Sequence, residues 1–189
     1  SLAGTQVKWK NIRIQTTNLQ PLQTGKSIHI VNMIPNNLSD DEKKQGFKLL
    51  FDGKNTDQWV GYSQPSFPSN RWKVEDGALV ITKKEDNAPN SDLITKESFG
   101  PVFDFRFEFK LTEGANSGVK YFVNTALNNS SGIGPEYQVL DDEKHPDAKM
   151  GAVGNRQLAS LYDLIPAVRP RNAMKKIGEW NTGRIVALP

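Results

Sequence analysis

The chain's most strongly patterned stretch is Phe103-Asp104-Phe105-Arg106-Phe107-Glu108-Phe109-Lys110-Leu111. Apolar and charged residues alternate strictly throughout it. Because successive side chains of a β-strand point to opposite faces of a sheet, this period of two predicts a strand with one buried and one solvated face. We expect the phenylalanines to enter the core, and Arg106, Glu108 and Lys110 to face the other way.

Shorter strand-like runs lie on both sides of this stretch, with Gly, Pro, Asn and Asp clustered between them. Many short strands separated by turn residues are typical of an antiparallel sandwich or jelly roll. Helix is scarce: Ser39 and Glu42 have the spacing of a capping box, and Gly46 is placed to end that helix. The strand-like runs are 47–51, 78–82, 119–123, 137–140 and 184–188. The sequence therefore predicts an all-β, antiparallel two-sheet jelly-roll sandwich with little helix.

Residues 1–36 carry two further strand-like runs. The first, 7–14, changes phase near Lys10-Asn11, which predicts a strand with a β-bulge. Residues 16–26 have the composition of a connector, and 27–34 form the second run. Two strands alone cannot make a stable domain. We therefore expect them either to add to the main sheet or to belong to a neighbouring unit.

Composition excludes several classes of protein. The chain of 189 residues has no Cys and only two His, His29 and His145, so it cannot form a disulfide framework, a thiolate zinc site or a multi-histidine metal site. No apolar run approaches the ~20 residues of a membrane-spanning helix. The first residues are neither basic nor followed by an apolar run, so we expect no signal peptide in this stretch and interpret its start as a trimmed or internal boundary.

The charges are distributed unevenly. The net charge is +3, yet residues 49–164 hold 12 Lys and Arg against 17 Asp and Glu, so the basic excess lies at the two ends. An acidic middle argues against a nucleic-acid binder, which would carry a basic stripe interleaved with aromatic residues. Surplus carboxylates suit hydrogen bonding to neutral, hydroxyl-rich ligands, or a hard cation. They are equally typical of a solvated surface.

Glu136-Tyr137-Gln138 is the most informative triplet for function. On a strand, residues 136 and 138 share one face, so a carboxylate and an amide project side by side and can bind vicinal hydroxyls. Asp141 and His145 follow closely and could bind a divalent cation or act as acid and base. The alternatives are the solvated side of an ordinary strand followed by a polar surface turn.

Four further polar residues are candidates for ligand binding. Asn116 and Ser117 could reach a ligand at the rim of the sheet, or serve only the turn before them. Lys120 could polarise a carbonyl group or pair with a neighbouring acid. Arg156 could bind an anionic or keto oxygen, although a lone Arg more often forms a surface ion pair. The tryptophans could stack on sugar rings, but we expect core positions for them; they are Trp59, Trp72 and Trp180.

Several short motifs occur in a fixed order along most of the chain. They are 38–53, Trp59, 72–79, 92–95, 103–111, 115–119, 134–141, 160–163 and 178–181. Each motif is weak alone, but the ordered set resembles the 3-keto-disaccharide hydrolase family. That resemblance implies a concanavalin A-like jelly roll in a bacterial protein that is periplasmic, outer-membrane-associated or secreted.

The resemblance also implies an activity, the hydrolysis or lyase-type cleavage of 3-keto-glycosides. Glu136 and His145 are then the candidate catalytic residues. Lys120, Arg156 or a bound divalent cation is the candidate electrophile, and the metal ligands stay open. The remaining substrate-binding candidates are Gln138, Asn116, Ser117 and Asp141. The alternatives are a lectin-like module that binds carbohydrate without catalysis, and a glycosidase with paired carboxylates.

The order of the motifs departs from the family at both ends. The family continues past the 178–181 motif with several more strands, whereas residues 6–14 resemble its final strand. We therefore expect the end of one copy in residues 1–36, followed by a jelly-roll domain in 37–189 that lacks its C-terminal strands. The simplest account of this order is a tandem protein, and the alternatives are a permuted domain or an incomplete sequence. In each case we expect the missing strands to come from another segment or, in an oligomer, from another chain.

Overall fold

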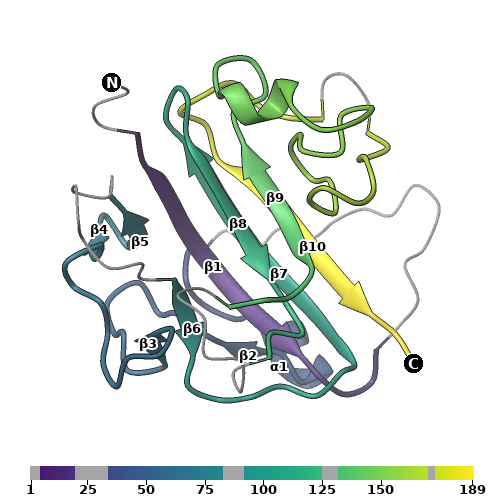
Figure 1. Cartoon of the computed structure of the whole chain (residues 1–189). Coiled ribbons are helices and arrows are strands. Elements are labelled where there is room, and N and C mark those ends of the chain that lie inside the picture. The colour runs from purple at the N-terminus through teal and green to yellow at the C-terminus, as the bar shows by residue number, and fades with distance from the viewer. Residues whose placement is uncertain (1–4, 20–33, 83–91, 125–131, 170–172) are drawn as a thin grey trace.

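The structure is a computed structural model that describes residues 5–19, 34–82, 92–124, 132–169 and 173–189. In these residues the strands are all paired antiparallel, and there is almost no helix. The largest unit is a six-stranded sheet, and Figure 1 shows its long strands running diagonally across the molecule. Its order is β10 (Asn181–Ala187), β7 (Phe103–Leu111), β1 (Val7–Gln15), β5 (Ala78–Ile81) and β4 (Trp72–Glu75), with β2 (Lys48–Leu49) also paired to β1.

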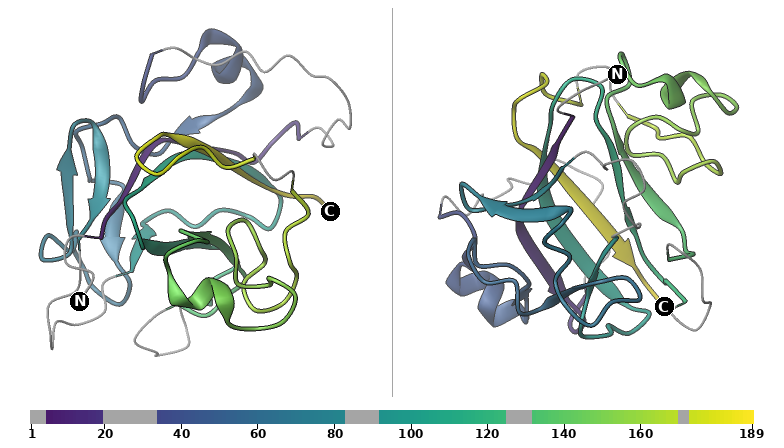
Figure 2. Two further views of the ribbon diagram at one scale, coloured as in Figure 1. Left: turned by 90° about the horizontal axis from the view of Figure 1, so that it is seen from above. Right: turned by 60° about the vertical axis from the view of Figure 1, so that its left-hand side comes forward.

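Two smaller sheets complete the described fold. One pairs β8 (Asn116–Lys120) with β9 (Glu136–Leu140), and the other pairs β3 (Trp59–Gly61) with β6 (Leu93–Thr95). Seen from above, β8 and β9 lie on one side of the large sheet and helix α1 (Asp40–Gln45) lies on the other (Figure 2, left). The all-β antiparallel sandwich predicted from the sequence is confirmed, whereas the concanavalin A-like strand order stays a prediction.

Strand β7 has the predicted two faces. Phe103, Phe107 and Phe109 are buried, and Phe105 packs against the same core. Phe107 contacts Trp9 of β1 and Tyr137 of β9, with ring centroids 5.6 and 5.7 Å away, so it joins the two layers. The opposite face of β7 is charged, as its alternation requires.

Strand β1 occupies the interior of the large sheet, between β7 on one side and β5 and β2 on the other. The predicted bulge is present: the register with β7 shifts between Lys10 and Arg13, and Asn11 has a φ of 51°. The run 7–14 therefore adds to the main sheet. The second predicted run, 27–34, lies outside the described residues except for Ile34.

Two local predictions about chain geometry have different outcomes. The capping box is formed, because Glu42 N–H donates to Ser39 Oγ at 3.1 Å and Ser39 N–H donates to Glu42 Oε2 at 2.8 Å, and Gly46 ends α1 with a φ of 90°. The run 119–123 is not a strand throughout, since β8 covers Asn116–Lys120. Phe122 has a φ of 53°, a left-handed conformation that ends an extended strand.

The tryptophans divide between core and surface. Trp59 and Trp72 are buried in the core, and the Trp59 indole N–H donates to Leu50 O at 2.8 Å. Trp180 instead lies beneath the ammonium groups of Lys10 and Lys110, at 4.3 and 4.9 Å from its ring centroid. Within the described ranges, no helix has both the length and the apolar character needed to cross a bilayer.

Candidate functional site

The β8–β9 pair brings polar residues of both strands together on one face. Its register places Lys120 opposite Glu136 and Gly118 opposite Gln138. Tyr137 and Val139 point the other way, into the core, as strand alternation requires. Two predicted residues, Glu136 and Lys120, are thereby brought together.

Gly118 makes room for the Glu136 carboxyl group. A Cβ atom on residue 118 would overlap Glu136 Oε1 and lie 2.7 Å from its Cδ atom. The glycine is therefore needed for space, because the side chain of Glu136 crosses the backbone of β8 at this point.

The environment of Glu136 favours its protonated form. Burial is the main cause that raises the pKa of the Glu136 carboxyl group. The positive charge of Lys120 acts against that rise, while the negative charges of Asp92 and Asp147 add to it. A carboxyl group with a raised pKa can accept and return a proton nearer neutral pH than an ordinary one.

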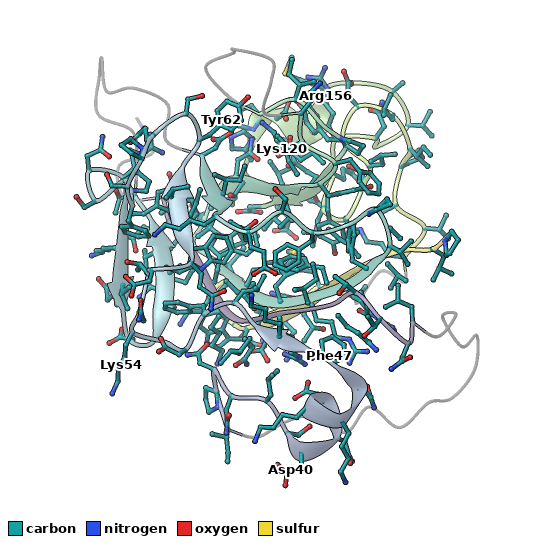
Figure 3. All side chains as sticks on the ribbon, turned by 90° about the horizontal axis from the view of Figure 1, so that it is seen from below. Asp40, Phe47, Lys54, Tyr62, Lys120 and Arg156 are labelled. Atoms are coloured by element: carbon teal, nitrogen blue, oxygen red, sulfur yellow. The ribbon has the colours of Figure 1, made fainter. Side chains whose placement is uncertain are left out.

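Asp92 is a partner of Lys120 that sequence analysis did not single out as a site residue. Its carboxylate lies 3.4 Å from Lys120 Nζ, and its main-chain oxygen accepts a hydrogen bond from Tyr62 N–H at 2.7 Å. Asp92 precedes β6, so this ion pair connects the two small sheets. Figure 3 shows the labelled side chains of Lys120 and Tyr62 on the same side of the molecule. For Asp92, the only signal in the sequence was its position in the family motif 92–95.

A cavity of about 540 Å³ lies beside these residues. It is lined by residues of β6, by every residue of β8 and by aromatic residues of the large sheet, including Phe105 and Phe107. Glu136, Lys120 and Asp92 line it together with Asn116 and Ser117. The cavity therefore combines apolar walls with a few convergent polar groups, as ligand-binding pockets do.

Arg156 lies in the loop that follows β9 and is held by two carboxylates. It donates to both oxygens of Asp163, at 2.8 and 3.1 Å, and to Asp147 at 3.0 Å. These hydrogen bonds raise the pKa of the Arg156 guanidinium group. Tyr162 O–H also donates to Asp147 at 3.0 Å, and Tyr162 N–H donates to Glu136 O at 2.9 Å. This cluster fixes the loop against β9, and Arg156 does not line the cavity.

Gln138, Asp141 and His145 lie outside the cavity lining. Gln138 is buried and its main chain is hydrogen-bonded to residues 159–160, and within the described residues its Oε1 atom has no hydrogen-bond partner. Asp141 is also buried, and its carboxylate accepts hydrogen bonds from Gly114 N–H at 2.7 Å and from the main chain of the following turn. His145 Nδ1 accepts from Asp147 N–H at 3.2 Å. The contacts observed for Asp141 and His145 thus stabilise turns.

The same turn does not fit a metal site as it is arranged. Asp142 accepts a hydrogen bond from Leu158 N–H and pairs with Arg169, while Asp147 is bound by Arg156 and Tyr162. Across the described ranges, no group of three or more His, Asp or Glu side chains could hold a metal ion. The carboxylates of Asp142 and Asp147 are thus already engaged by donors of the protein.

Comparisons with known proteins agree with one another. The sequence profile of a family described as the 3-keto-alpha-glucoside-1,2-lyase-like domain matches residues 46–189. A protein of Bacteroides thetaiotaomicron named 3-keto-disaccharide hydrolase is 37% identical over 186 residues, which is 91% of this chain and 62% of that protein. The chain thus spans 62% of the length of this relative. A crystal structure of a proposed glycosyl hydrolase from Parabacteroides distasonis has a TM-score of 0.67 and 25% identity, covering 80% of this chain and 68% of that one.

Proposed function

The chain belongs to the 3-keto-alpha-glucoside-1,2-lyase-like family, and from this membership we propose that it cleaves 3-keto-glycosides at the Glu136–Lys120 site. One observation carries the proposal more than any other. The half-buried Glu136 carboxyl group, with its raised pKa, lies opposite Lys120 beside a cavity large enough for a small ligand. Proton abstraction next to a carbonyl group needs this combination of a base and a cation.

The proposed reaction begins at C2 of the keto-sugar. The C3 ketone acidifies the hydrogen on C2, and the Glu136 carboxylate removes it as a proton. The ammonium group of Lys120 stabilises the enolate oxygen that forms at C3. The enolate then expels the C1 oxygen, which takes a proton from solvent, leaving a C1–C2 double bond conjugated with the ketone.

Water completes the reaction if hydrolysis is the outcome. It adds to C1 of the unsaturated ketone while C2 regains a proton, which Glu136 can return. The net change is then hydrolysis of the glycosidic bond, whereas release of the unsaturated ketone would be a lyase reaction. The name of the Bacteroides relative favours hydrolysis, and the family description favours the lyase reaction. Both reactions use the same first step.

Turnover of a defined substrate tests the proposal. We expect the purified chain to release the leaving group from a 3-keto-glucoside but not from the corresponding glucoside, which has no acidified C2 hydrogen. Glu136→Gln should lower kcat about 10²–10⁴-fold while sugar binding changes little. The exposed Glu143 provides a matched control, because Glu143→Gln removes a carboxylate from the neighbouring turn. Absence of turnover with retained sugar binding would favour the lectin-like alternative.

Gln138, Asn116 and Ser117 remain proposed substrate contacts, and the observations support them unequally. Asn116 and Ser117 line the cavity, while Gln138 carries a buried oxygen without a partner among the described residues. Asp141, His145 and Arg156 lie outside the cavity lining and make the contacts described above, and their predicted roles stay predictions. On the family resemblance alone, we propose that the protein is located in the cell envelope or outside the cell, and that it forms a tandem or oligomeric assembly. Cell fractionation tests the location, and light scattering tests the assembly.

A further inference from the structure

Three arginines form one row across the large sheet, on the face opposite the cavity. Arg106 of β7 is directly opposite Arg13 of β1 on one side and Arg184 of β10 on the other. Like charges directly opposite on neighbouring strands are destabilising. The row therefore needs compensating negative charge.

Two carboxylates of the protein supply part of that charge. Asp104 accepts from Arg106 at 3.2 and 2.9 Å and from Arg184 at 2.9 and 2.7 Å, so each guanidinium binds it through two N–H groups. Glu42 of α1 lies 2.6 Å from Arg13 Nε. Asp104 already accepts four hydrogen bonds, which is the full capacity of a carboxylate. The row retains one positive charge in excess over these two carboxylates.

A pocket of about 350 Å³ opens beside this row, which we call the arginine pocket. Its lining holds three cationic side chains, those of Lys44, Arg106 and Arg184, against the single carboxylate of Asp104. Lys44 also lies 3.8 Å from Asp41, but both side chains are largely exposed. The other lining residues are Gln15, Asn18 and Gln45.

The two guanidinium groups of the arginine pocket are held in place with donors to spare. Each guanidinium has five N–H groups, and Asp104 uses two of them. Arg106 also stacks on the Phe47 ring, 4.4 Å from its centroid. The side chains of Arg106 and Arg184 are 30 and 31% exposed, respectively. Donors fixed before binding lower the entropic cost of binding a ligand.

We propose that the arginine pocket binds a small oxyanion, either a carboxylate or a phosphate group. Such a group would accept the spare N–H donors of Arg106 and Arg184 and would neutralise the excess positive charge. Guanidinium groups recognise these oxyanions through paired, charge-assisted hydrogen bonds. The site is separate from the Glu136–Lys120 site, because Asp104 and Arg106 alternate along β7 with the phenylalanines that face the core.

Titration of the full chain with three probes tests this proposal. Inorganic phosphate, glucuronate and neutral glucose would each be added at constant, low ionic strength, because salt screens exposed charges. We expect saturable binding of phosphate or glucuronate by calorimetry, with no saturable binding of glucose at the arginine pocket. The tighter of the two anions identifies whether inorganic phosphate or an organic acid is the better ligand.

Variants locate the binding site. Arg184→Gln should weaken anion binding about tenfold or more, since it removes one charge-assisted pair. Lys44→Gln changes an exposed residue and leaves the strand pairing intact. It should weaken anion binding a few-fold, and it tests the site even if the Arg184→Gln protein folds poorly. Lys73→Gln removes the same charge from the large sheet outside the pocket and should have no effect. Unsaturable binding, equal affinity in all three variants, or binding lost in Lys120→Met instead would overturn the proposal.

Discussion

The carboxyl group of Glu136 occupies the space that a side chain at Gly118 would fill. These two residues lie on paired strands, with Gly118 opposite Gln138 and Lys120 opposite Glu136, so the carboxyl group lies across β8 instead of extending directly to its partner. The position of the proposed base therefore depends on the absence of a Cβ atom on the neighbouring strand.

The first prediction concerns that dependence. Gly118→Ala should displace the Glu136 carboxyl group and lower kcat about 10²-fold, the cost of misplacing a reacting group by about 1 Å. Circular dichroism should show an unchanged sheet, since the group that must move is the end of a flexible side chain. In a Glu136→Ala background, Gly118→Ala should cost nothing further. A full additional loss in the double variant would show that the alanine acts elsewhere.

The second prediction concerns pH. If Glu136 is the base, kcat/KM should fall as pH drops through its pKa, which burial raises above the ordinary range of a carboxyl group. Lys120→Met should move this acid limb to higher pH, because it removes a cation that favours the carboxylate. Asp92→Asn should move it to lower pH, because it removes a neighbouring negative charge. Kinetics across the pH range measure both shifts, and shifts of the opposite sign would contradict the assignment.

The third prediction concerns the core contact between the layers. Phe107→Ala should cost about 3–5 kcal/mol of unfolding free energy, because it opens a cavity among Trp9, Tyr137 and Phe109. Urea denaturation measures the loss. Phe122 is a matched control, since its ring is 53% exposed and Phe122→Ala should cost less than about 1 kcal/mol. Equal losses in the two variants would mean that Phe107 does not join the layers.

The fourth prediction concerns the buried carboxylate of the arginine row. Burial alone would raise the pKa of Asp104, but hydrogen bonds from Arg184 and Arg106 outweigh it and hold the pKa below the ordinary value. A depressed folded pKa stabilises the fold above the unfolded pKa, and this contribution is lost as pH falls through the folded pKa. Asp104→Asn should cost about 2–4 kcal/mol at neutral pH and much less in acid.

Denaturation of both proteins at two pH values checks that expectation. The exposed Asp76 serves as the control, because Asp76→Asn should change stability by less than about 0.5 kcal/mol at either pH. A penalty for Asp104→Asn that persists unchanged in acid would show that packing, and not the charge of the carboxylate, is responsible.

The fifth prediction concerns the N-terminal strand. Deleting residues 1–15 removes β1 from between β7 and β5, which would expose the strand edges and the core face of the large sheet. We expect the truncated chain to be insoluble or to lack a cooperative melting transition. A soluble product with an unchanged melting temperature would mean that β1 is dispensable.

Local patterns in the sequence were enough to predict the elements of this fold. Strict alternation placed β7 and its two faces, the phase change near Lys10-Asn11 located the bulge, and the capping box defined α1. These features depend on neighbouring residues, whose side-chain directions follow from backbone geometry. They also placed Glu136 and Gln138 on one face of β9. The pattern failed for residues 121–123, since β8 ends at Lys120 and Phe122 has a positive φ, which no feature of the sequence had signalled.

The assembly of the site depends on tertiary structure. Asp92 meets Lys120 only because β6 and β8 approach each other, and Asp147 acts on Glu136 only because the loop after β9 folds back over it. Asp141 and His145, close to Glu136 in sequence, are instead engaged by main-chain N–H groups of their own turns. Alternate residues point to the same side only while the strand continues, so the turn after Leu140 ends the alternation on which the predicted groove depended. The sequence by itself determined which strands form and which faces they bury, while long-range packing decided which charged groups meet and which of them contact the cavity.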